Sequence, residues 1–517
     1  MLQCVVLEPT KQFHDPLGQK YKKFFAKAGY DVNCIFVETE KDLRKILTQK
    51  NMDIFISDLS FDTEDFAGLL VVRSIKIDFP DIFIIGNSRA DIGYRQVAAR
   101  LPSFDLFIEK GGLYGDDASY LEETRKEFLN KFRRNPDIVI SEKSEFLDDS
   151  SRKIKKRDFE SLVSQVLFFG HGSDGAVTPK EAVFIPLSGG RSSSMVYKLL
   201  GQNQDGHTIT VPAVFKISPI QNALCEKANY DAYVKWILPY SWRVDILGFG
   251  VTKKWGAVCY SFIKSGYDDF DALAKYIMEG KDQIIKEAFS KVFDPSKKHW
   301  YSDHFLSKES NINERYDSRY FGSVSTRNET SRFFIENIQN LFNANVSPNG
   351  FRVFGEKYMR PEARLFGQPN GDYHSCICHG DLNGNNLIVS ESGEVIFIDF
   401  QETGRGHVFE DFVTMEAGLR LNYLLHDEQP KENEWLEFLD AERKVSKIEN
   451  LDSHKGLFKH IWSIRSLAKQ NFPFEDFSSY YYGVAAFNFR LLRLKGLTST
   501  QIGRTIIAIL VALENLN

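Results

Sequence analysis

The chain has 517 residues, of which 43% are hydrophobic and 26% charged, with a formal net charge of −5 and a pI near 6.2. These values are typical of a soluble globular protein of two or three domains. They argue against a dedicated nucleic-acid-binding protein, whose binding domain would be strongly basic, but they leave small nucleotide sites open.

The cysteines and apolar segments bear on the compartment. Six cysteines are scattered along the chain, unlike the dense framework of a short disulfide-bonded secreted protein. The first residues lack a basic region followed by an apolar core, so they make a poor signal peptide. The apolar run around Ile506–Leu513 is too short to span a bilayer. We therefore expect a cytoplasmic protein with reduced thiols and no membrane partner.

Residues 1–134 alternate between short apolar runs and segments of helical spacing. This alternation predicts a parallel sheet with helices on both faces, which is a doubly wound α/β domain. The functional edge of such a domain lies at the carboxyl ends of its strands. The predicted strands are Cys4–Leu7, Val32–Phe36, Asp53–Ser57, Ile82–Ile85 and Leu106–Ile108. The predicted helices are Gln19–Ala28, Glu40–Gln49, Phe66–Asp78, Ile92–Arg100 and Asp117–Arg134.

Polar residues follow four of these predicted strands. Glu8 follows the first strand, Asp58 the third, Ser88 (or Asn87) the fourth and Lys110 the fifth. In this order they resemble the receiver domains of response regulators. The resemblance implies that Asp58 is the phosphoacceptor, that the residue after the fourth strand senses the phosphate and that Lys110 neutralises it.

The chain departs from the receiver pattern after the first strand. The family carries two adjacent acids there to bind Mg²⁺, whereas this chain has Glu8-Pro9. A degenerate receiver that only binds a partner is therefore the alternative interpretation. If Asp58 is phosphorylated, the face formed by strands four and five would transmit the charge change to the rest of the chain or to an oligomer contact. A histidine kinase or another signalling protein is the partner that this resemblance implies.

Residues 135–157 carry clustered charges without periodic apolar spacing, which predicts a linker. Residues 158–263 are rich in predicted strands and carry one predicted helix, Ala223–Leu238, so they predict an antiparallel small lobe. The predicted strands of this lobe are Ala182–Leu187, Ser194–Leu200, Val211–Ile217, Val244–Gly250 and Ala257–Ile263.

Lys216 lies near the end of an apolar strand in this lobe, and Glu226 follows ten residues later at the start of the predicted helix. A Lys–Glu pair of this kind places a positive charge on the α- and β-phosphates of a nucleotide. Asp231 is the reserve partner for the lysine. The segment Ser261–Ser265, including Ser261 and Ile263, follows the hairpin predicted from the last two strands of the lobe. It is similar in position to the hinge of kinase-like lobes, which implies that its backbone meets adenine.

A small-residue segment lies between two predicted strands of the lobe. Its backbone amides can approach phosphates, although it lacks the Gly-Lys-Ser/Thr ending of a P-loop. A plain hairpin turn is the alternative. The phosphate-binding candidates in this segment are Ser188, Gly189, Gly190 and Ser192.

The strongest motif combines His379-Gly-Asp381 with Asn386, five residues after the aspartate, and with Asp399 at the end of a second apolar run. Phosphoryl transfer needs an oriented acceptor hydroxyl and a metal ion that bridges the phosphates. One carboxylate can accept the hydroxyl proton, while an amide oxygen and a second carboxylate can hold Mg²⁺, which prefers oxygen ligands. The order of catalytic loop, short hairpin and metal-binding acid matches the kinase arrangement.

The motif resembles the catalytic loop of aminoglycoside phosphotransferases and their choline-kinase relatives, where His-Gly-Asp replaces His-Arg-Asp. The resemblance implies that Asp381 is the catalytic base, that His379 orients the loop, that Asn386 and Asp399 hold magnesium and that Asp411 braces the loop. It implies an α+β two-lobed protein-kinase-like fold with residues 264–517 as a helical large lobe. It also implies ATP, or another nucleoside triphosphate, and Mg²⁺ as cofactors.

The sequence does not assign a role to two parts of the large lobe. The residues Cys376-x-Cys378-His379 could bind zinc, but strand alternation places both cysteines on one face of a buried strand, whereas His379 belongs to the loop. About 110 residues separate the hinge from the catalytic loop, and inserted helices of this kind often line an acceptor pocket in the family. No residue of this stretch is assigned.

The leading hypothesis is an ATP-dependent phosphotransferase that acts on a hydroxyl group of a small molecule or a protein and is regulated by the receiver-like domain. One alternative is a pseudokinase or signalling scaffold that binds nucleotide and partners without turnover. Another is a kinase fold that transfers a nucleotide. The pairing of the two domains suggests bacterial signalling or a defence-type system more than antibiotic resistance.

Overall fold

The computed structural model describes residues 1–50, 52–58, 67–88, 104–109, 113, 118–132, 138–142, 144, 154–167, 179–187, 194–202, 207–208, 212–261, 270–294, 300–307, 311–367, 371–424, 430–448 and 454–516. They form two compact units. The first unit contains Met1–Leu224 and Asp245–Phe262, and the second contains Cys225–Val244 and Ile263–Asn517. Among the described residues, no helix is both long enough and apolar enough to cross a bilayer.

The first unit begins with a parallel five-stranded sheet in the order β2-β1-β3-β4-β5. Its strands are β1 (Leu2–Leu7), β2 (Val32–Val37), β3 (Ile54–Asp58), β4 (Phe83–Ser88) and β5 (Leu106–Glu109). The helices around it are η1 (Lys11–Phe13), α1 (His14–Lys27), α2 (Glu40–Gln49), α3 (Ala67–Asp78) and α6 (Ala118–Lys131). The helix predicted over Ile92–Arg100 lies outside the described residues.

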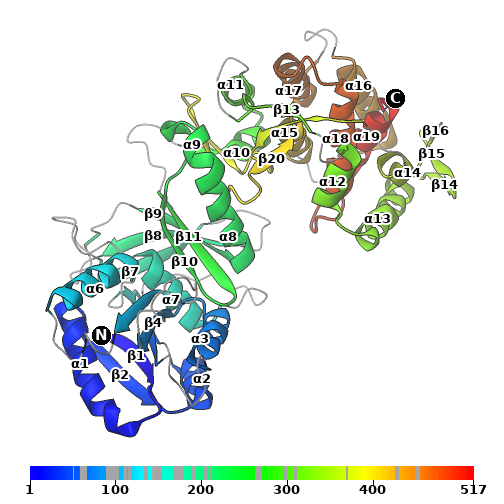
Figure 1. Ribbon diagram of the computed structural model, residues 1–517. Coiled ribbons are helices and arrows are strands. Elements are labelled where there is room, and N and C mark those ends of the chain that lie inside the picture. The colour runs from blue at the N-terminus through cyan, green and yellow to red at the C-terminus, as the bar shows by residue number, and fades with distance from the viewer. Residues whose placement is uncertain are drawn as a thin grey trace. The chain divides into compact units, whose positions relative to one another are not determined.

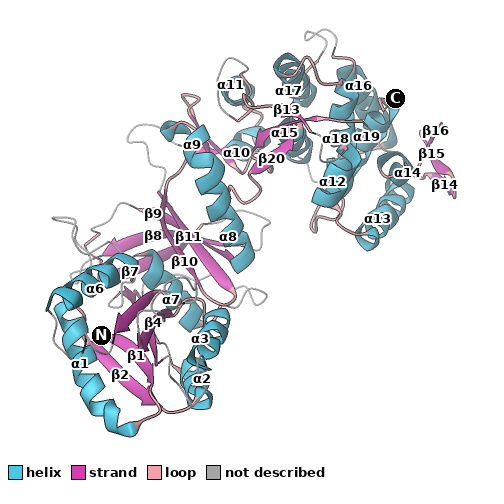
Figure 2. Ribbon diagram, viewed as in Figure 1, coloured by secondary structure: helices cyan, strands magenta, loops and turns pink. Residues whose placement is uncertain are grey.

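Successive residues of the strands enter two separate cores, because strand side chains alternate between faces. Cys4 and Val6 of β1 pack in the core formed with α1 and α6. Val5 and Leu7 pack in the core formed with α2 and α3. Figures 1 and 2 show these two pairs of helices on opposite faces of the sheet. The predicted doubly wound α/β domain is therefore confirmed.

The first unit also contains a second sheet, with the order β10-β11-β9-β8-β7-β6. Its strands are β6 (Val139–Ile140), β7 (Glu181–Pro186), β8 (Met195–Gln202), β9 (Ala213–Pro219), β10 (Ile246–Val251) and β11 (Trp255–Ser261). Neighbours pair antiparallel except β6 with β7, so the predicted linker contributes a short parallel strand. Helix α7 (Lys156–Val166) was not predicted, although Phe159, Leu162 and Val163 form a buried stripe on it.

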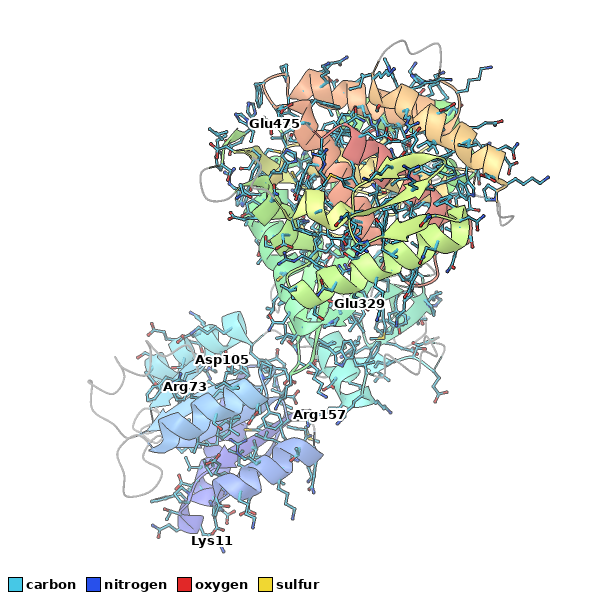
Figure 3. All side chains as sticks on the ribbon, turned by 90° about the vertical axis from the view of Figure 1, so that its right-hand side faces the viewer. Lys11, Arg73, Asp105, Arg157, Glu329 and Glu475 are labelled. Atoms are coloured by element: carbon cyan, nitrogen blue, oxygen red, sulfur yellow. The ribbon has the colours of Figure 1, made fainter. Side chains whose placement is uncertain are left out.

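Polar contacts join the parallel sheet's helices to this second sheet within the first unit. Asp78, at the end of α3, accepts hydrogen bonds from Arg44 of α2 at 2.7 Å and from Lys253, between β10 and β11, at 2.8 Å. Arg157 of α7, labelled in Figure 3, donates to the carbonyl of Leu47 at 2.5 Å. The ends of α2 and α3 are therefore tied to the strand-rich part of the unit.

The helix predicted over Ala223–Leu238 is present in three pieces. It consists of α8 (Ile220–Asn229), a π-helical turn η2 (Tyr230–Val234) and α9 (Lys235–Ile237), and is followed by the 3₁₀ turn η3 (Tyr240–Trp242). Such π turns often occur at functional sites.

The second unit is mainly helical and holds three short sheets. The sheets have the orders β12-β18-β19, β13-β17-β20 and β14-β15-β16. Their strands are β12 (Phe270–Ala272), β13 (Phe305–Leu306), β14 (Asn345–Ser347), β15 (Gly350–Val353), β16 (Glu356–Tyr358), β17 (His374–Cys378), β18 (Leu387–Ser390), β19 (Val395–Phe397) and β20 (Gly404–His407). The helices are α10 (Leu273–Met278), α11 (Asp282–Val292), α12 (Ile312–Tyr320), α13 (Val324–Phe342), α14 (Pro361–Leu365), α15 (Glu410–Asn422), α16 (Glu432–Ser446), α17 (Leu457–Asn471), α18 (Phe477–Leu491) and α19 (Ser499–Glu514). Helices combined with short antiparallel sheets confirm the predicted α+β class for this part of the chain.

A buried ionic quartet joins three helices of this unit, and a tyrosine from a fourth helix bonds to it. Arg420 of α15 bonds Glu442 of α16 at 3.0 and 2.6 Å, and Arg465 of α17 bonds Glu416 of α15 at 3.0 and 2.7 Å. Tyr480 of α18 also donates to Glu416, at 2.5 Å. Two positive and two negative charges balance there, which a buried ionic cluster requires. The quartet holds α15, the helix whose first turn reaches the catalytic loop.

Candidate active site

The predicted catalytic loop lies between two strand pairs of the second unit. Strand β17 ends at Cys378 and pairs antiparallel with β20, whereas β18 begins at Leu387 and pairs with β19. Because Leu387 pairs with Phe397, the residues on either side of this pair are also neighbours. The amide of Ile398 donates to the carbonyl of Asn386 at 3.1 Å. The pairing therefore brings Asp399, one residue further on, close to the end of the loop.

Asn386 contacts Asp381 directly. Its Nδ2 donates to the carbonyl oxygen of Asp381 at 2.8 Å and to Oδ2 of the same residue at 3.1 Å. Asn383 adds a second side-chain amide on that carbonyl, at 3.1 Å. With the nitrogen of Asn386 used in this way, Oδ1 is the atom of its amide that can ligate a cation. The loop thus aligns a carboxylate and an amide oxygen beside each other.

Asp399 adopts an unusual backbone conformation. Its φ is 65°, in the left-handed region that non-glycine residues enter infrequently. Such conformations cost about 1–3 kcal/mol and are concentrated at functional sites. The side chain is half-buried, and β19 ends two residues before it. The carboxylate of Asp399 and the amide oxygen of Asn386 are donors of the type that suits Mg²⁺, which usually binds one or two carboxylates together with substrate phosphates and water.

Asp411, in the first turn of α15, holds the loop backbone. Its carboxylate accepts from the amides of His379 and Gly380, both at 2.8 Å, and from the hydroxyl of Tyr301 at 3.2 Å. Burial raises the pKa of Asp411 to about 7, although the two backbone donors oppose the rise. Gly380 has a φ of 83°, and a Cβ there would lie 2.2 Å from the carbonyl oxygen of Glu402. Only glycine fits this position without a shift of the backbone.

His379 is fully buried and faces backbone groups. One ring nitrogen, Nε2, lies 3.0 Å from the carbonyl oxygen of Ile398, and the carbonyl of His379 accepts from Thr403 at 3.2 Å. The indole of Trp300 packs edge-on against the imidazole. This environment ties the loop to the segment that carries Asp399, so the geometry supports an orienting role for His379 and not one in proton transfer.

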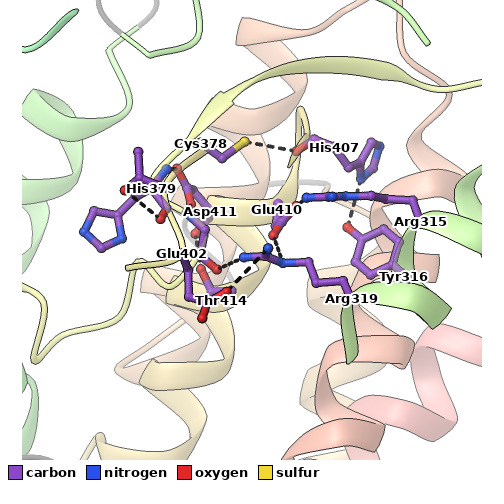
Figure 4. A network of polar contacts seen from close by, with 12 residues as sticks. Arg315, Tyr316, Arg319, Cys378, His379, Glu402, His407, Glu410, Asp411 and Thr414 are labelled. Atoms are coloured by element: carbon purple, nitrogen blue, oxygen red, sulfur yellow. Dashed lines mark hydrogen bonds and ion pairs between the residues drawn. The ribbon is translucent and has the colours of Figure 1, made fainter. Parts of the chain in front are cut away.

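Two arginines that were not predicted complete the support of the loop, as Figure 4 shows. Arg319 of α12 donates through Nη2 to the carbonyl of Gly380 at 2.8 Å and forms an ion pair with Glu410 through Nε. Arg315, one turn earlier, donates to the same glutamate at 3.1 Å. Glu410 is 1% exposed. The detectable sequence signal was the spacing of Arg315 and Arg319, which are four residues apart in the unassigned stretch before the loop.

Asp381 is half-buried, and its environment favours the protonated form more than water does. Burial raises the pKa of Asp381 to about 6, and the negative charges of Asp399 and Glu402 add to the rise. The positive charges of Arg490 and Arg319 oppose it. A carboxylate with a pKa near 6 is a stronger base than an ordinary aspartate and is still ionised at neutral pH.

The predicted nucleotide-binding residues lie on several elements. Lys216 is a buried residue of β9, and Ser261 ends β11, where its hydroxyl accepts from the amide of Asp245 at 3.0 Å. Glu226 of α8 is fully buried, whereas the reserve candidate Asp231 is half-exposed and pairs with Lys227. The remaining candidates, Ser188, Gly189, Gly190, Ser192 and Ile263, lie outside the described residues.

The receiver-type residues follow their predicted strands. Glu8 comes directly after β1 and is 3% exposed. Asp58 ends β3 and pairs in register with Asn87 of β4, and Ser88 ends β4. Asn87 is buried and donates to the hydroxyl of Tyr21, a core residue of α1. The side chains of Asp58 and Ser88, and all of Lys110, lie outside the described part of the chain.

The cysteines before the loop lie side by side, as strand alternation predicted. The sulfur atoms of Cys376 and Cys378 are 3.6 Å apart, and both residues are buried. Within the described residues, no three histidine, cysteine, aspartate or glutamate side chains are grouped closely enough to hold a metal ion by themselves.

Comparisons with known proteins support the resemblance of the catalytic segment. Residues 357–448, which include the loop, Asp399 and Asp411, match the model of the phosphotransferase enzyme family (APH). No curated protein matches the sequence significantly. The phosphotransferase resemblance inferred from the catalytic motif is therefore confirmed for this segment.

Solved structures of two kinds resemble the chain at low identity. An aminoglycoside phosphotransferase, APH(4)-Ia in complex with ADP and hygromycin B, is 8% identical; the match covers 64% of this chain and 93% of that one, with a TM-score of 0.34. APH(3'')-Id from Streptomyces rimosus is 12% identical over 59% of this chain and 92% of its own, with a TM-score of 0.30. A response regulator receiver domain protein from Clostridium thermocellum is 15% identical over 24% of this chain and 95% of its own, with a TM-score of 0.19.

Proposed function

We propose that the chain is a phosphotransferase that moves the γ-phosphoryl group of ATP to a hydroxyl group of an acceptor. The observation that carries this proposal is the arrangement of Asp381, Asn386 and Asp399 at one end of the β18–β19 strand pair, inside the segment that matches the phosphotransferase family. The three residues offer a base and a set of oxygen ligands within a loop that is braced by buried groups.

Asp381 is the proposed base. Its Oδ2 accepts from Asn386, which leaves Oδ1 to accept the proton of the acceptor hydroxyl. The hydroxyl oxygen forms a bond to the γ-phosphorus as the bond from that phosphorus to the bridging oxygen breaks, and ADP leaves. Asn386 and Asp399 would hold Mg²⁺, which when bound neutralises charge on the phosphates. Lys216 is the proposed cation for the α- and β-phosphates, with Glu226 as its partner.

A thermal-shift experiment with ATP and Mg²⁺ tests nucleotide binding apart from turnover. Wild type is expected to show a magnesium-dependent rise in Tm that Asp399→Asn loses, because one carboxylate ligand is removed. Asp381→Asn is the matched control and should keep the rise, since the base is not required for binding. Absence of a magnesium-dependent shift in wild type would instead support the pseudokinase or scaffold alternative.

Mass spectrometry of the products separates the two kinds of enzyme. A modified acceptor that has gained a phosphoryl group, with release of ADP, supports the proposal. An acceptor that has gained a nucleotide, with release of pyrophosphate, supports nucleotidyl transfer. Candidate acceptors come from fractionated small metabolites and proteins incubated with labelled ATP.

We further propose that the receiver-like domain regulates this activity, with a histidine kinase or another signalling protein as its partner. The contacts of Asp78 with Arg44 and Lys253 support the proposal, because they connect α2 and α3 to the strand-rich part of the same unit. Phosphorylation of Asp58 would add charge at the end of β3.

Activity and assembly are compared for wild type, Asp58→Ala and Lys253→Gln, with and without acetyl phosphate. Identical behaviour of all three would reject regulation by this route.

A further inference from the structure

Arg490, in the last turn of α18, packs against two aromatic rings. Its guanidinium carbon is 5.1 Å from the centroid of the Tyr320 ring and 5.4 Å from that of Phe487. The two rings contact each other edge to face, with centroids 5.4 Å apart. Rings at these distances attract a guanidinium and occupy its surroundings without using its N–H groups. The side chain is therefore held in place while its donors stay available.

The position of Arg490 relative to the catalytic loop follows from α12. Tyr320 is the last residue of α12, and its neighbour Arg319 donates to the carbonyl of Gly380, next to Asp381. Arg493, three residues after Arg490, donates to the carbonyl of Tyr320 at 2.7 Å. Through Tyr320 and Arg319, Arg490 is therefore connected to the loop that carries the proposed base. Among the charges around Asp381, that of Arg490 has the largest effect on the pKa after burial itself.

The other arginines of this neighbourhood already have partners. Arg315 and Arg319 pair with Glu410, and Arg493 uses the carbonyl of Tyr320. The side chain of Arg490 forms no hydrogen bond or ion pair with any residue that the structure describes, although it is half-buried. A partly desolvated guanidinium beside a reaction centre, with its donors unused, matches an oxyanion in charge and in hydrogen-bonding geometry.

We propose that Arg490 binds an anionic group of the acceptor, so that the substrate is a hydroxy compound that carries a carboxylate or a phosphate. The inference rests on the proposed phosphotransferase function and specifies its substrate class. When the anionic group of the acceptor binds Arg490, the hydroxyl group of the acceptor is presented to Asp381. The positive charge of the arginine repels acceptors that carry an amine. Arg490 is thereby a specificity-determining residue.

Equilibrium binding to the full chain, loaded with Mg²⁺ and ADP, tests the proposal. The probes are glycerate, glycerol 3-phosphate and glycerol, which share hydroxyl groups and differ in charge. At least one anion is expected to bind tenfold or more tightly than glycerol, and the order of the two anions distinguishes a carboxylate from a phosphate. Arg490→Gln should remove the difference, and Arg490→Lys should restore part of it. Arg332→Gln, an exposed position on α13, is the charge-matched control and should leave the difference unchanged.

Two results would overturn the inference. One is that neither anion binds more tightly than glycerol, and the other is that Arg490→Gln keeps the preference. If Arg490 acts only on the base, Arg490→Gln will shift the pH dependence of activity without changing the preference for anions, which also rejects the inference. Failure of the proposed function is separate, because it appears as loss of the magnesium-dependent Tm shift with ATP.

Discussion

The second unit holds two buried charge networks that differ in how completely their charges are paired. The quartet of Glu416, Arg420, Glu442 and Arg465 pairs every charge with an opposite one inside the helix core. The network at the catalytic loop bonds the backbone through Asp411 and Arg319 but leaves Asp381 half-buried with a raised pKa. In the first network the two positive and two negative charges are balanced, and the network stabilises the helices. The second is a rigid support for groups that still have bonding capacity for a ligand.

Asp381→Asn should cause the largest loss in the rate of phosphoryl transfer and leave the contacts that hold the catalytic loop intact. The substitution keeps the shape of the side chain but removes the base, which is worth about 10²–10⁴-fold in rate. The rate of phosphoryl transfer is compared with the free energy of unfolding in urea, which should not fall. A variant that retains more than a tenth of the wild-type rate would show that Asp381 is not the base.

Glu416→Gln should affect stability where Asp381→Asn affects rate. Burial alone would raise the pKa of Glu416, but the charges of Arg420 and Arg465 hold it well below its usual range. Removal of the carboxylate leaves these two buried cations with too little negative charge, and such losses cost about 3–5 kcal/mol. Chemical denaturation measures the loss, with the exposed Glu437→Gln on α16 as the control. Equal stability of both variants would contradict the assignment.

Gly380→Ala should disturb the loop itself. The left-handed conformation disfavours alanine, and the added Cβ would meet the carbonyl oxygen of Glu402 at 2.2 Å. We expect a cost of about 1–3 kcal/mol in stability, together with slower transfer because Asp381 follows directly. Gly393→Ala, also at positive φ but in the turn between β18 and β19, is the comparison for the cost of the backbone conformation, because the atom nearest to an added Cβ there would be a side-chain atom, Oε2 of Glu287, at 3.0 Å. If the two variants transfer phosphoryl groups equally well, the close packing of Gly380 has no catalytic importance.

The smallest effect on the rate of phosphoryl transfer is expected from a change in pH. Because burial raises the pKa of Asp381 to about 6, the base is ionised above that pH and becomes protonated below it. Transfer should therefore fall as the pH drops through about 6, approaching tenfold per unit. Arg490→Gln removes a cation that opposes the rise, so its acid limb should move to higher pH. A wild-type profile that is flat between pH 5 and 7 would contradict a rate-limiting role for this carboxylate.

Much of the fold was predictable because its signals are local. The five parallel strands of the front sheet appear as short apolar runs, and the helices between them have apolar spacing on one face. Helix α7 was missed because the charged stretch before it was assigned to a linker, although it has a buried stripe. Strand β6 has only two residues and depends on its neighbour β7 for pairing, so no local pattern marks it.

The sequence by itself indicated the proposed base and metal ligands. Asp381, Asn386 and Asp399 lie in a short motif, in which Asn386 comes just before β18 and Asp399 just after β19. Only the tertiary structure decided which residues support and surround them. Arg319 reaches Gly380 across 61 positions of sequence, and Arg490 meets Tyr320 only because α18 packs against α12. Such partners depend on how helices pack, and packing leaves no spacing pattern along the chain.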